Sequence, residues 1–453
     1  MVTVKEKIFN QYDIRGKFPD EINEESSQLI GAGLVEFLKK EKLESDIIVG
    51  HDARLSSPDL SRSIIDGICR QGFNVINIGL CTTDCASFAS GYLNLPAVMV
   101  TASHNPKEYN GFKFYLAGAK ILDFKNGLLD IKNIINGNID SSEIVGRVEI
   151  KNIHSEYIKY LQGFVDSKEL KPLKIVVDVG NGAVAPFAEE LFKSLPFEVV
   201  KLNFNMDGNF PGRGPNPTIH GVLDELKKKV LEYSASIGVA FDADGDRVVF
   251  VDDEAYNIPP SIIASWILES SFGANVKIIY DARQVKLIEE VVGRLKMVGI
   301  REYSGRSIIK RRMENDDADF AVEQSCHYYF KDAYYSDSGL IALLYVLKHL
   351  SLKYPTSASA LAMPWRKEWV GFEENIVAKG QLDEKIKKII EKYVTPTSSC
   401  KVLDSADRLI LDCGDWYLNL RASNTEPVFR LNIEAKQWAL LEEKMSEIKM
   451  VVF

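Results

Sequence analysis

The amino-acid sequence predicts an α/β protein of several domains with largely parallel sheets. At 453 residues the chain is too long for a single hydrophobic core, because single cores stop growing near about 250–300 residues. Apolar, strand-like runs alternate with amphipathic, helix-like stretches through most of the chain, which is typical of α/β architecture. Three of the strand-like runs also resemble one another, which indicates related units within the chain.

The three similar runs each lead a short apolar strand into an aspartate. They are residues 47–54 (IIVGHDAR), 174–178 (KIVVD) and 277–283 (KIIYDAR). Similar turns between strands and helices also arise by chance, which is the competing explanation. We interpret the repeated pattern as three α/β units of related design.

Breaks in the pattern mark the expected domain boundaries. A polar stretch at 136–142 precedes a helical pattern that starts near His154, and residues 257–260 (NIPP) end a strand pair and open a new helix. A turn-rich segment at 354–359 (YPTSAS) precedes the last part of the chain. The expected domains are residues 1–150, 151–256, 257–360 and 361–453.

The last of these segments has a different rhythm from the other three. Its strand-like runs follow one another without intervening helices, and a helical pattern then continues to the end of the chain. The strand-like runs are residues 399–404, 408–413, 415–421 and 428–435. We therefore expect a smaller α+β domain here.

Composition describes an ordinary soluble globular protein, with 46% hydrophobic residues, 26% charged residues and a mean hydropathy of -0.09. The net charge of -9 argues against nucleic acid as a partner, because its binders carry basic faces. It does not argue against phosphorylated substrates, since a few arginines make a local positive cleft on an acidic protein. No apolar run approaches the ~20 residues of a membrane span, so no membrane partner is expected.

The cysteines and the amino terminus point to a reduced cytoplasm. Six cysteines are few for this length, and Cys81 and Cys85 have no second pair at zinc-site spacing. We interpret that pair as buried free thiols rather than metal ligands. The charged first residues are not followed by the apolar region of a signal peptide.

A candidate nucleophile lies in residues 101–106 (TASHNP), directly after the apolar run at 96–100. Ligand chemistry in α/β sheets sits at the carboxyl ends of strands, and a serine there acts as a nucleophile when a neighbouring group activates it. Ser103 is the candidate. The alternative is a helix N-cap, because serine and asparagine before proline are good cap residues.

A candidate metal site lies in residues 242–247 (DADGDR). Asp242, Asp244 and Asp246 beside a glycine suit a hard cation, and Mg²⁺ prefers oxygen ligands of this kind. An EF-hand is excluded because Arg247 occupies the position of its glycine, and because the flanking segments read as strands. A solvated acidic turn neutralised by Arg247 is the remaining alternative.

Two further segments have the chemistry of ligand binding. Residues 421–427 (RASNTEP) combine an arginine, two hydroxyls, an amide and a tight turn, which suits a phosphate dianion. Residues 323–327 (EQSCH) hold a carboxylate, a hydroxyl and an imidazole, which suit sugar hydroxyls or, equally, a helix cap. No Walker A sequence occurs, and residues 31–33 (GAG) lack the third glycine of a dinucleotide site, so ATP and NAD are poorly supported.

Taken together and in this order, the motifs resemble the α-D-phosphohexomutase family, closest to archaeal and bacterial phosphomannomutase/phosphoglucomutase enzymes. The resemblance spans the chain. Its motifs are residues 12–16 (YDIRG), 101–106, 109–113 (YNGFK), 242–247 and 421–427. It implies a four-domain, heart-shaped fold, with three similar α/β domains and a smaller α+β carboxyl-terminal domain around a central cleft.

The resemblance also implies roles for individual residues. Ser103 would carry the phosphoryl group, and Mg²⁺ would bind an oxygen of that group together with Asp242, Asp244 and Asp246. The residues around the transferring group would be Ser103, Arg15, His104, Lys113 and Arg247. The substrate-binding residues would be Arg283, Arg306, Glu323, Ser325, His327, Arg421, Ser423, Asn424 and Thr425. Within that set, Glu323 and Ser325 would hold the O3 and O4 hydroxyls of the sugar.

The implied activity is the reversible conversion of hexose 1-phosphates to hexose 6-phosphates. The phosphoserine would donate to the free hydroxyl, the hexose 1,6-bisphosphate would turn over, and the serine would recover a phosphoryl group from its other end. The bisphosphate would also serve as activator, and the partners would be small sugar phosphates. Either Lys113 or His104 would take the proton of the attacking hydroxyl. The sequence leaves the oligomeric state open.

The chain departs from the family pattern at four positions. Val322 and Cys326 replace the two glycines of the usual sugar loop, while Glu323, Ser325 and His327 are retained. Arginine replaces the more frequent histidine at Arg306 and the more frequent lysine at Arg283. These two changes keep or add positive charge, which suits a cleft for phosphates.

Three rival functions follow from the same residues. A phosphoglucosamine mutase is the first, because such enzymes often carry the Glu-Gln-Ser sequence found around Gln324. A metal-dependent sugar phosphatase is the second, with water as the acceptor. A non-catalytic sugar-phosphate binding protein is the third, and it is disfavoured because Ser103, the three aspartates and Arg421 are all present.

Overall fold

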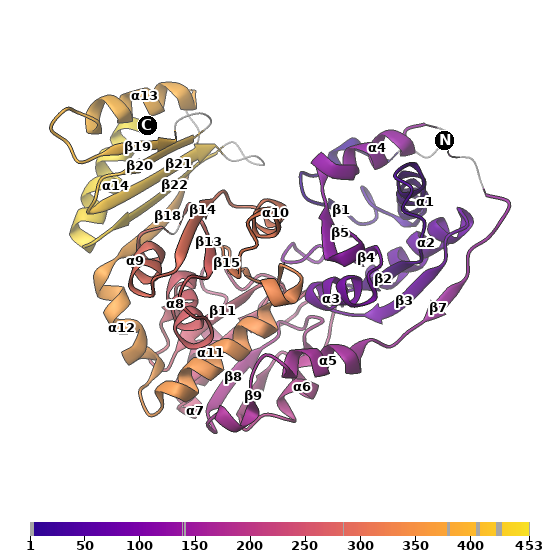
Figure 1. The fold of residues 1–453 in the computed structure, drawn as a ribbon, viewed down its shortest axis with the longest axis horizontal. Coiled ribbons are helices and arrows are strands. Elements are labelled where there is room, and N and C mark those ends of the chain that lie inside the picture. Colours follow the sequence, from indigo (N-terminus) through magenta and orange to yellow (C-terminus); the bar gives the residue numbers. More distant parts are fainter. Residues whose placement is uncertain are drawn as a thin grey trace.

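The computed structural model describes residues 4–137, 139, 142–283, 285–377, 381–404, 408–422 and 428–452. The chain forms four sheets in sequence order, and the units built around them are called domains I to IV. Domain I lies at the right of Figure 1 in indigo and purple, and domain IV lies at the upper left in yellow. Domains II and III lie between them, so the two ends of the chain stand on opposite sides of the molecule.

Domain I is a seven-stranded sheet covered on both faces. Its strands are β1 (Ile14–Lys17), β2 (Ile47–His51), β3 (Val75–Leu80), β4 (Ala97–Val100), β5 (Tyr109–Leu116), β6 (Lys120–Leu122) and β7 (Val148–Ile150), in the order β1-β5-β4-β2-β3-β7 with β6 beside β5. Strands β4, β2, β3 and β7 are mutually parallel, and β5 and β1 are antiparallel additions. Its helices are η1 (Glu6–Ile8), α1 (Glu24–Lys40), α2 (Ser57–Arg70), α3 (Thr83–Leu93), η2 (Ala117–Ala119), η3 (Phe124–Leu128) and α4 (Leu129–Ile135).

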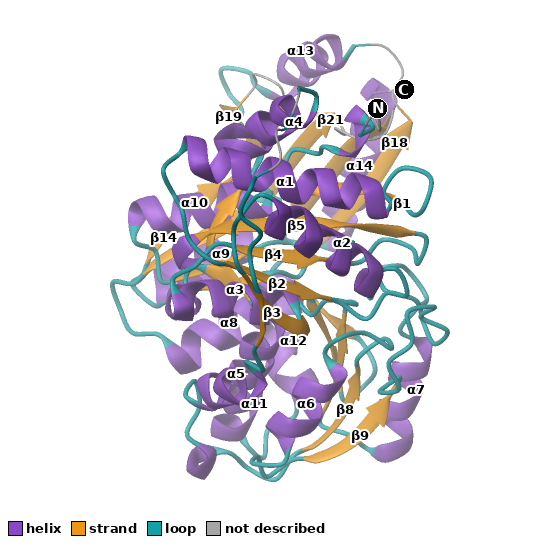
Figure 2. Cartoon of the chain, turned by 90° about the vertical axis from the view of Figure 1, so that its right-hand side faces the viewer, coloured by secondary structure: helices purple, strands orange, loops and turns teal. Residues whose placement is uncertain are grey.

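The helices of domain I divide between the two faces of its sheet. Helices α1, α2 and α4 pack on one face through residues such as Ile30, Ile64 and Ile131. Helix α3 covers the other face, where Phe88 and Ala89 meet the core shared with domain II. Figure 2 shows α1 and α2 on the outside of these strands. The sheet is therefore buried on both sides, which explains its nearly continuous apolar strands.

Domains II and III repeat the α/β design with five strands each. Domain II contains β8 (Lys174–Asp178), β9 (Glu198–Leu202), β10 (Ile237–Phe241), β11 (Val248–Asp252) and β12 (Asn257–Ile258), with α5 (His154–Gln162), η4 (Ser167–Glu169), α6 (Ala185–Phe192) and α7 (Asp224–Tyr233). Domain III contains β13 (Lys277–Asp281), β14 (Val298–Glu302), β15 (Phe320–Val322), β16 (Tyr328–Phe330) and β17 (Ser336–Asp337), with α8 (Pro260–Ser271), α9 (Lys286–Arg294), α10 (Arg306–Asp316), η5 (Lys331–Ala333), α11 (Gly339–Lys353) and α12 (Ala358–Glu368). In both domains the first three strands in the sequence are parallel, and the last two strands are added to them in antiparallel pairing.

Domain IV is built differently. Its sheet is wholly antiparallel, in the order β18-β22-β21-β20-β19. The elements are β18 (Val370–Val377), α13 (Leu382–Tyr393), β19 (Lys401–Asp404), β20 (Arg408–Asp412), β21 (Trp416–Ala422), β22 (Val428–Ala435) and α14 (Trp438–Val452). Cys400 and Cys413 form a disulfide beside the β19–β20 pair.

The hydrophobic cores follow the same division. One large core joins the three α/β domains, with Met99, Val176 and Leu343 as members from each in turn. Domain IV has a core of its own between its sheet and the helices α13 and α14, where Leu418, Ile433 and Ile389 are buried. The large core also takes in Ile410 and Tyr417 of domain IV, so domain IV packs against the other three domains and has a further core of its own.

The predicted fold class is confirmed, with three α/β domains and a smaller α+β domain at the carboxyl end. The strand-like runs predicted in the last segment became β19 to β22, whereas β18 and α13 were not predicted. Cys81 and Cys85 are buried free thiols, as expected. The boundaries after residues 150, 256 and 360 stay predictions. Within the described part of the chain, no helix has the length and apolarity needed to cross a membrane.

Candidate active site

Three loops at strand ends meet around Ser103, and the first two come from domains I and II. The serine loop (residues 101–109) follows β4, and the acidic loop (residues 242–247) follows β10. The hydroxyl of Ser103 donates to Asp242 Oδ2 at 2.9 Å, although the two residues are 139 positions apart. Ser103 is 3% exposed, and the parallel strands of domains I and II therefore bring a buried serine against the predicted metal ligands.

The acidic loop has the donor set of a hard-cation site. Asp242, Asp244 and Asp246 are buried, and each offers a carboxylate oxygen within 4.8 Å of the others. Asp244 Oδ1 is buried without a hydrogen-bond partner among the described residues. Three converging carboxylates with an unpaired oxygen fit Mg²⁺, because this ion takes oxygen ligands and neutralises their mutual repulsion.

Charge in the acidic loop is divided unevenly. Burial, and then the charges of Asp246 and Asp244, raise the pKa of Asp242 well above its usual value. Burial acts in the same direction on Asp244 and Asp246, but their pKa values are lowered because Lys113 acts together with Thr83 at Asp244, and with His327 and Arg306 at Asp246. Lys113 Nζ lies 2.7 Å from Asp244 Oδ2 and 2.6 Å from Asp246 Oδ2. Lys113 therefore neutralises part of the negative charge of the acidic loop.

The other predicted cations and the imidazole surround the serine. His104 Nδ1 lies 3.2 Å from Ser103 Oγ, and burial followed by Arg247 and Arg15 lowers the pKa of its imidazole. Arg15 donates to Asn105 Oδ1 in the serine loop at 2.5 Å. The backbone N–H of Arg247 donates to Asp242 Oδ1 at 3.1 Å, while its buried side-chain Nε has no hydrogen-bond partner within the described ranges. Positive charge therefore gathers where a phosphoryl group on Ser103 would lie.

The loop after β15 (residues 323–327) lies in domain III and reaches the same region. Glu323 is 2% exposed and accepts from the N–H of Gly305 at 2.8 Å and from Tyr329 Oη at 2.5 Å. Ser325 Oγ and His327 Nδ1 are 2.9 Å apart. His327 Nε2 stands 3.5 Å from Asp246 Oδ1, which links this loop to the acidic loop.

Arg306 bridges domains I and III. Its Nε donates to both oxygens of Asp337 at 2.9 Å, and its Nη2 donates to the hydroxyl of Tyr115 at 2.8 Å. These partners were not found from the sequence, since 191 positions separate Tyr115 from Arg306 and only the fold brings them together.

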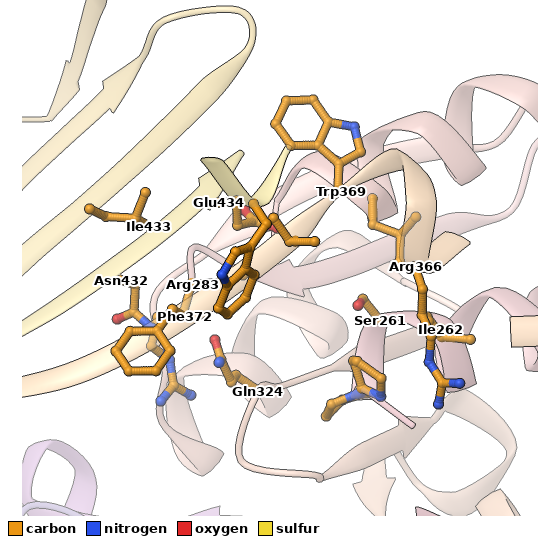
Figure 3. A pocket seen from close by; sticks show the side chains of 16 residues that line it. Ser261, Ile262, Arg283, Gln324, Arg366, Trp369, Phe372, Asn432, Ile433 and Glu434 are labelled. Atoms are coloured by element: carbon orange, nitrogen blue, oxygen red, sulfur yellow. The ribbon is translucent and has the colours of Figure 1, made fainter. Parts of the chain in front are cut away.

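Arg283 lies at a cavity of about 370 Å³ between domains III and IV, shown in Figure 3. Its Nε donates to Asp281 Oδ2 at 2.7 Å. Gln324 also lines this cavity, so this residue lies toward the junction of the two domains while its neighbour Glu323 is buried in domain III. The remaining wall includes Trp369, Phe372 and Glu434.

Arg421 lies on β21, where it pairs in register with Arg430 of β22. Burial, followed by the charges of Arg283 and Arg430, lowers its pKa. Arg421 therefore lies within the field of two further guanidinium groups, opposed by the carboxylates of Asp281 and Glu373, and this concentration of positive charge suits an anionic ligand. Ser423, Asn424 and Thr425, predicted in the same phosphate-binding loop, lie outside the described residues.

Family models match most of the chain in three consecutive blocks. They are the phosphoglucomutase/phosphomannomutase alpha/beta/alpha domains I, II and III, at residues 6–138, 155–255 and 260–367. The chain belongs to the phosphoglucomutase/phosphomannomutase family. The resemblance inferred from the motifs is confirmed at this level.

Relatives and solved structures agree over the whole length. A phosphomannomutase of Vibrio cholerae serotype O1 is 34% identical over 462 residues, covering 98% of each chain. The crystal structure of a phosphoglucomutase/phosphomannomutase family protein from Burkholderia thailandensis is 28% identical, with a TM-score of 0.87 and coverage of 99% and 97%. An Aspergillus fumigatus N-acetylphosphoglucosamine mutase, crystallised with GlcNAc-6P and magnesium, shares the fold at 14% identity, a TM-score of 0.59 and coverage of 99% and 96%.

Proposed function

We propose that the protein is a phosphomannomutase/phosphoglucomutase that interconverts hexose 1-phosphates and hexose 6-phosphates, with Ser103 as the phosphoryl carrier. The observation that carries the proposal is the buried contact of 2.9 Å between Ser103 Oγ and Asp242 Oδ2. A buried serine against three carboxylates, with Lys113, Arg15 and Arg247 around it, suits a reaction that depends on positioning and charge neutralisation.

Magnesium is the ion that fits the acidic loop. Asp242, Asp244 and Asp246 would hold it, together with an oxygen of a phosphoryl group on Ser103. When bound, it would act as a Lewis acid that neutralises the phosphoryl oxygens. The Aspergillus fumigatus relative was crystallised with magnesium, which supports the same choice for this chain.

The chemistry that we propose transfers one phosphoryl group in each half of the cycle. The bond between Ser103 Oγ and phosphorus breaks while the free hydroxyl of the sugar phosphate forms a new bond to phosphorus. The hydroxyl proton leaves to a nearby base, and His104 is better placed than Lys113, because Lys113 is held by two carboxylates. After the bisphosphate turns over, the same step in reverse returns a phosphoryl group to Ser103.

The remaining proposed contacts hold the substrate. Glu323 and Ser325 bind O3 and O4, and Arg421 with Arg283 binds the phosphate that is not reacting. Arg306 acts close to the sugar while its own position is fixed by Asp337 and Tyr115. We also assign Ser423, Asn424 and Thr425 to the distal phosphate, from their place in the motif.

A coupled assay tests the activity. Purified protein with Mg²⁺ and a trace of glucose 1,6-bisphosphate is given glucose 1-phosphate or mannose 1-phosphate, and the 6-phosphate is detected by a coupled dehydrogenase. We expect turnover of both sugars with almost no inorganic phosphate released. Stoichiometric phosphate release would instead identify a sugar phosphatase, and binding without either product would identify a non-catalytic protein.

The choice of sugar is tested by comparing specificity constants. Glucose, mannose and glucosamine share the orientation of O3 and O4, and Gln324 lies at the domain III–IV cavity rather than in the buried part of its loop. We therefore expect comparable kcat/KM for the glucose and mannose phosphates, with glucosamine 1-phosphate as an additional substrate. A preference for glucosamine 1-phosphate of more than about a hundredfold, or roughly 2.7 kcal/mol, would establish a phosphoglucosamine mutase instead.

A further inference from the structure

The backbone of the serine loop is gathered around one buried guanidinium. Arg54 Nη2 donates to the carbonyl oxygens of Ser103 and Asn105 at 2.5 and 2.7 Å. Its Nη1 donates to the carbonyl oxygens of Pro106 and Tyr109 at 2.8 and 2.9 Å. A single side chain therefore satisfies four backbone acceptors of the loop that carries the nucleophile.

Arg54 is itself fixed from two sides. Its Nε donates to Asp52 Oδ2 at 3.1 Å, and the ring of Phe210, from the loop after β9 of domain II, lies 5.2 Å from the guanidinium carbon. Arg54 is 1% exposed. Because water is excluded and the counter-charge is adjacent, the guanidinium has little freedom to leave the loop.

The loop needs such a restraint because of the backbone conformation of Ser103. Its φ of 48° lies in the left-handed region, which costs a residue other than glycine on the order of 1 kcal/mol or more. The N–H of Ser103 donates to Thr101 Oγ1 at 2.8 Å, and its carbonyl oxygen is held by Arg54. The peptide groups on both sides of the residue are therefore restrained, and the hydroxyl is directed at Asp242.

We propose that Arg54 is the positioning residue that holds Ser103 in its left-handed conformation for phosphoryl transfer. The inference rests on the proposed function. Arg54 does not touch the substrate in this arrangement, since its five donors are occupied by Asp52 and by loop carbonyls. Its effect is confined to the placement of Ser103 Oγ and of the phosphoryl group on it.

The geometry requires a guanidinium and not only a positive charge. Four carbonyl oxygens in two pairs match the planar fork of arginine, whereas the ammonium of lysine has three donors that radiate from one point. Arg54→Lys keeps the charge opposite Asp52 and loses most of the loop contacts. Since a misplacement of about 1 Å at a reacting atom costs roughly a hundredfold in rate, we expect kcat to fall by about that factor.

The experiment compares wild-type protein, Arg54→Lys and the matched control Arg311→Lys. Arg311 likewise faces a buried carboxylate, Asp123, with Nη2 2.6 Å from Oδ2, and among the described residues it has no hydrogen bond to the serine loop. For each protein, kcat and KM are measured with glucose 1-phosphate, the phosphate on Ser103 is quantified by mass spectrometry, and folding is monitored by circular dichroism. Single-turnover transfer from phosphorylated protein to glucose 6-phosphate isolates the chemical step.

The expected result is a loss of about a hundredfold in kcat and in single-turnover rate for Arg54→Lys, with KM within about threefold of wild type. Arg311→Lys should keep both rates. An Arg54→Lys protein with wild-type single-turnover transfer overturns the inference, and so does an equal loss in the control. If the wild-type protein shows no turnover, or carries no phosphate on Ser103, the proposed function is rejected instead.

A second variant covers the case in which Arg54→Lys does not fold. Phe210→Ala removes the ring over the guanidinium and none of its hydrogen bonds. Water then competes for Arg54, and we expect kcat to fall about tenfold at constant KM, or about 1.4 kcal/mol in the barrier. A Phe210→Ala protein with unchanged kcat would also overturn the inference.

Discussion

Domains I and III use the same Asp-Ala-Arg sequence at the end of a parallel strand, and they put its arginine to different uses. In both, the aspartate accepts the backbone N–H of the arginine, at 3.0 Å in the Asp52–Arg54 pair and 2.9 Å in the Asp281–Arg283 pair. In both, the arginine Nε returns to the same aspartate. The local sequence therefore builds one turn twice.

The difference lies beyond the turn. Both terminal nitrogens of Arg54 donate to carbonyl oxygens of the serine loop. In contrast, Nη2 of Arg283 donates back to Asp281, and Arg283 borders the cavity between domains III and IV. In domain III it is Asp281 that holds the functional loop, by accepting the N–H of Gln324 at 3.3 Å. The same turn thus holds a loop through its arginine in one domain and leaves its arginine at a cavity in the other.

Domain II reaches a similar end with different residues. Asp178 is the last residue of β8, much as Asp52 directly follows β2, but its arginine comes from a distant loop, where Arg213 Nε lies 2.8 Å from Asp178 Oδ2. Nη2 of Arg213 donates to the carbonyl oxygen of Phe241, directly before the acidic loop. Each α/β domain therefore has an aspartate–arginine pair at a strand end, and one member of the pair holds the neighbouring loop: the arginine in domains I and II and the aspartate in domain III.

The comparison predicts that substitutions in domain I cause the largest losses of activity. Ser103→Ala removes the phosphoryl carrier, and we expect kcat to fall by at least about a thousandfold, the scale seen when a nucleophile is lost. Ser325→Ala in domain III is the matched change, and it should cost about tenfold, mostly in KM. Steady-state kinetics of both variants measure the ratio. Equal losses at the two serines would remove the proposed asymmetry.

The second prediction concerns the acidic loop. Asp244→Asn removes one proposed Mg²⁺ ligand and one of the two carboxylate partners of Lys113, and we expect kcat to fall about a hundredfold or more because weaker Mg²⁺ binding leaves the phosphoryl oxygens without their counter-charge. Mg²⁺ affinity, measured by calorimetry, should fall in parallel. Exhaustive chelation of the wild type should stop turnover without unfolding it. Undiminished activity after chelation would show that the acidic loop is only a turn.

Arg283→Lys should have a smaller effect than Arg54→Lys, although both exchange an arginine paired with a strand-end aspartate. A cation near the non-reacting phosphate contributes to ground state and transition state alike, so we expect KM to rise about three- to tenfold with kcat nearly constant. Saturation curves with glucose 1-phosphate distinguish the two patterns. A fall in kcat at constant KM would place Arg283 with Arg54.

The smallest predicted effect concerns stability in domain IV. Burial raises the pKa of Glu434 to about 7, above its ordinary value of 4.5. The hydrogen bonds that Glu434 accepts from the backbone N–H groups of Val285 and Lys286 lower the pKa but do not cancel the effect of burial. A carboxyl with a raised pKa in the folded state stabilises the fold below about pH 4.5, and this contribution is lost as pH rises through about 7.

The difference in unfolding free energy between Glu434→Gln and wild type should therefore shift in favour of the variant as the pH rises from 5 to 8. The expected gain is on the order of 1–3 kcal/mol at pH 8, from 1.36 kcal/mol for each pKa unit. Calorimetry at both pH values measures it, with the exposed Glu443→Gln of α14 as control. A difference that does not change with pH would contradict the raised pKa.

Much of this site could be predicted from sequence because its chemistry is local. Ser103 and the three aspartates lie in short motifs whose resemblance to a known family indicated their roles, and the strand-like runs of domain IV were clear enough to locate β19 to β22. Strand β18 was missed because most of its side chains are exposed or only partly buried, so it lacks a clear alternation.

The partners of Arg54 could not be predicted, for a different reason. Its acceptors are backbone carbonyl oxygens, which every residue possesses, so no side-chain pattern marks them. The repeated Asp-Ala-Arg sequence was noticed, but only the path of the serine loop reveals what the first copy does. The contact of Arg306 with Tyr115 is of the same kind, since it depends on the packing of domain III against domain I.

The separate core of domain IV affects the order in which parts of the molecule unfold. Leu418 and Ile433 lie in a core apart from the one around Met99, and local opening can be confined to one part of a structure. Heat or a protease that loosens domain IV would therefore release Arg421 while Ser103 is still held by domains I and II. On the proposed assignment, such molecules would keep the residues for phosphoryl transfer and lose a contact that retains the substrate.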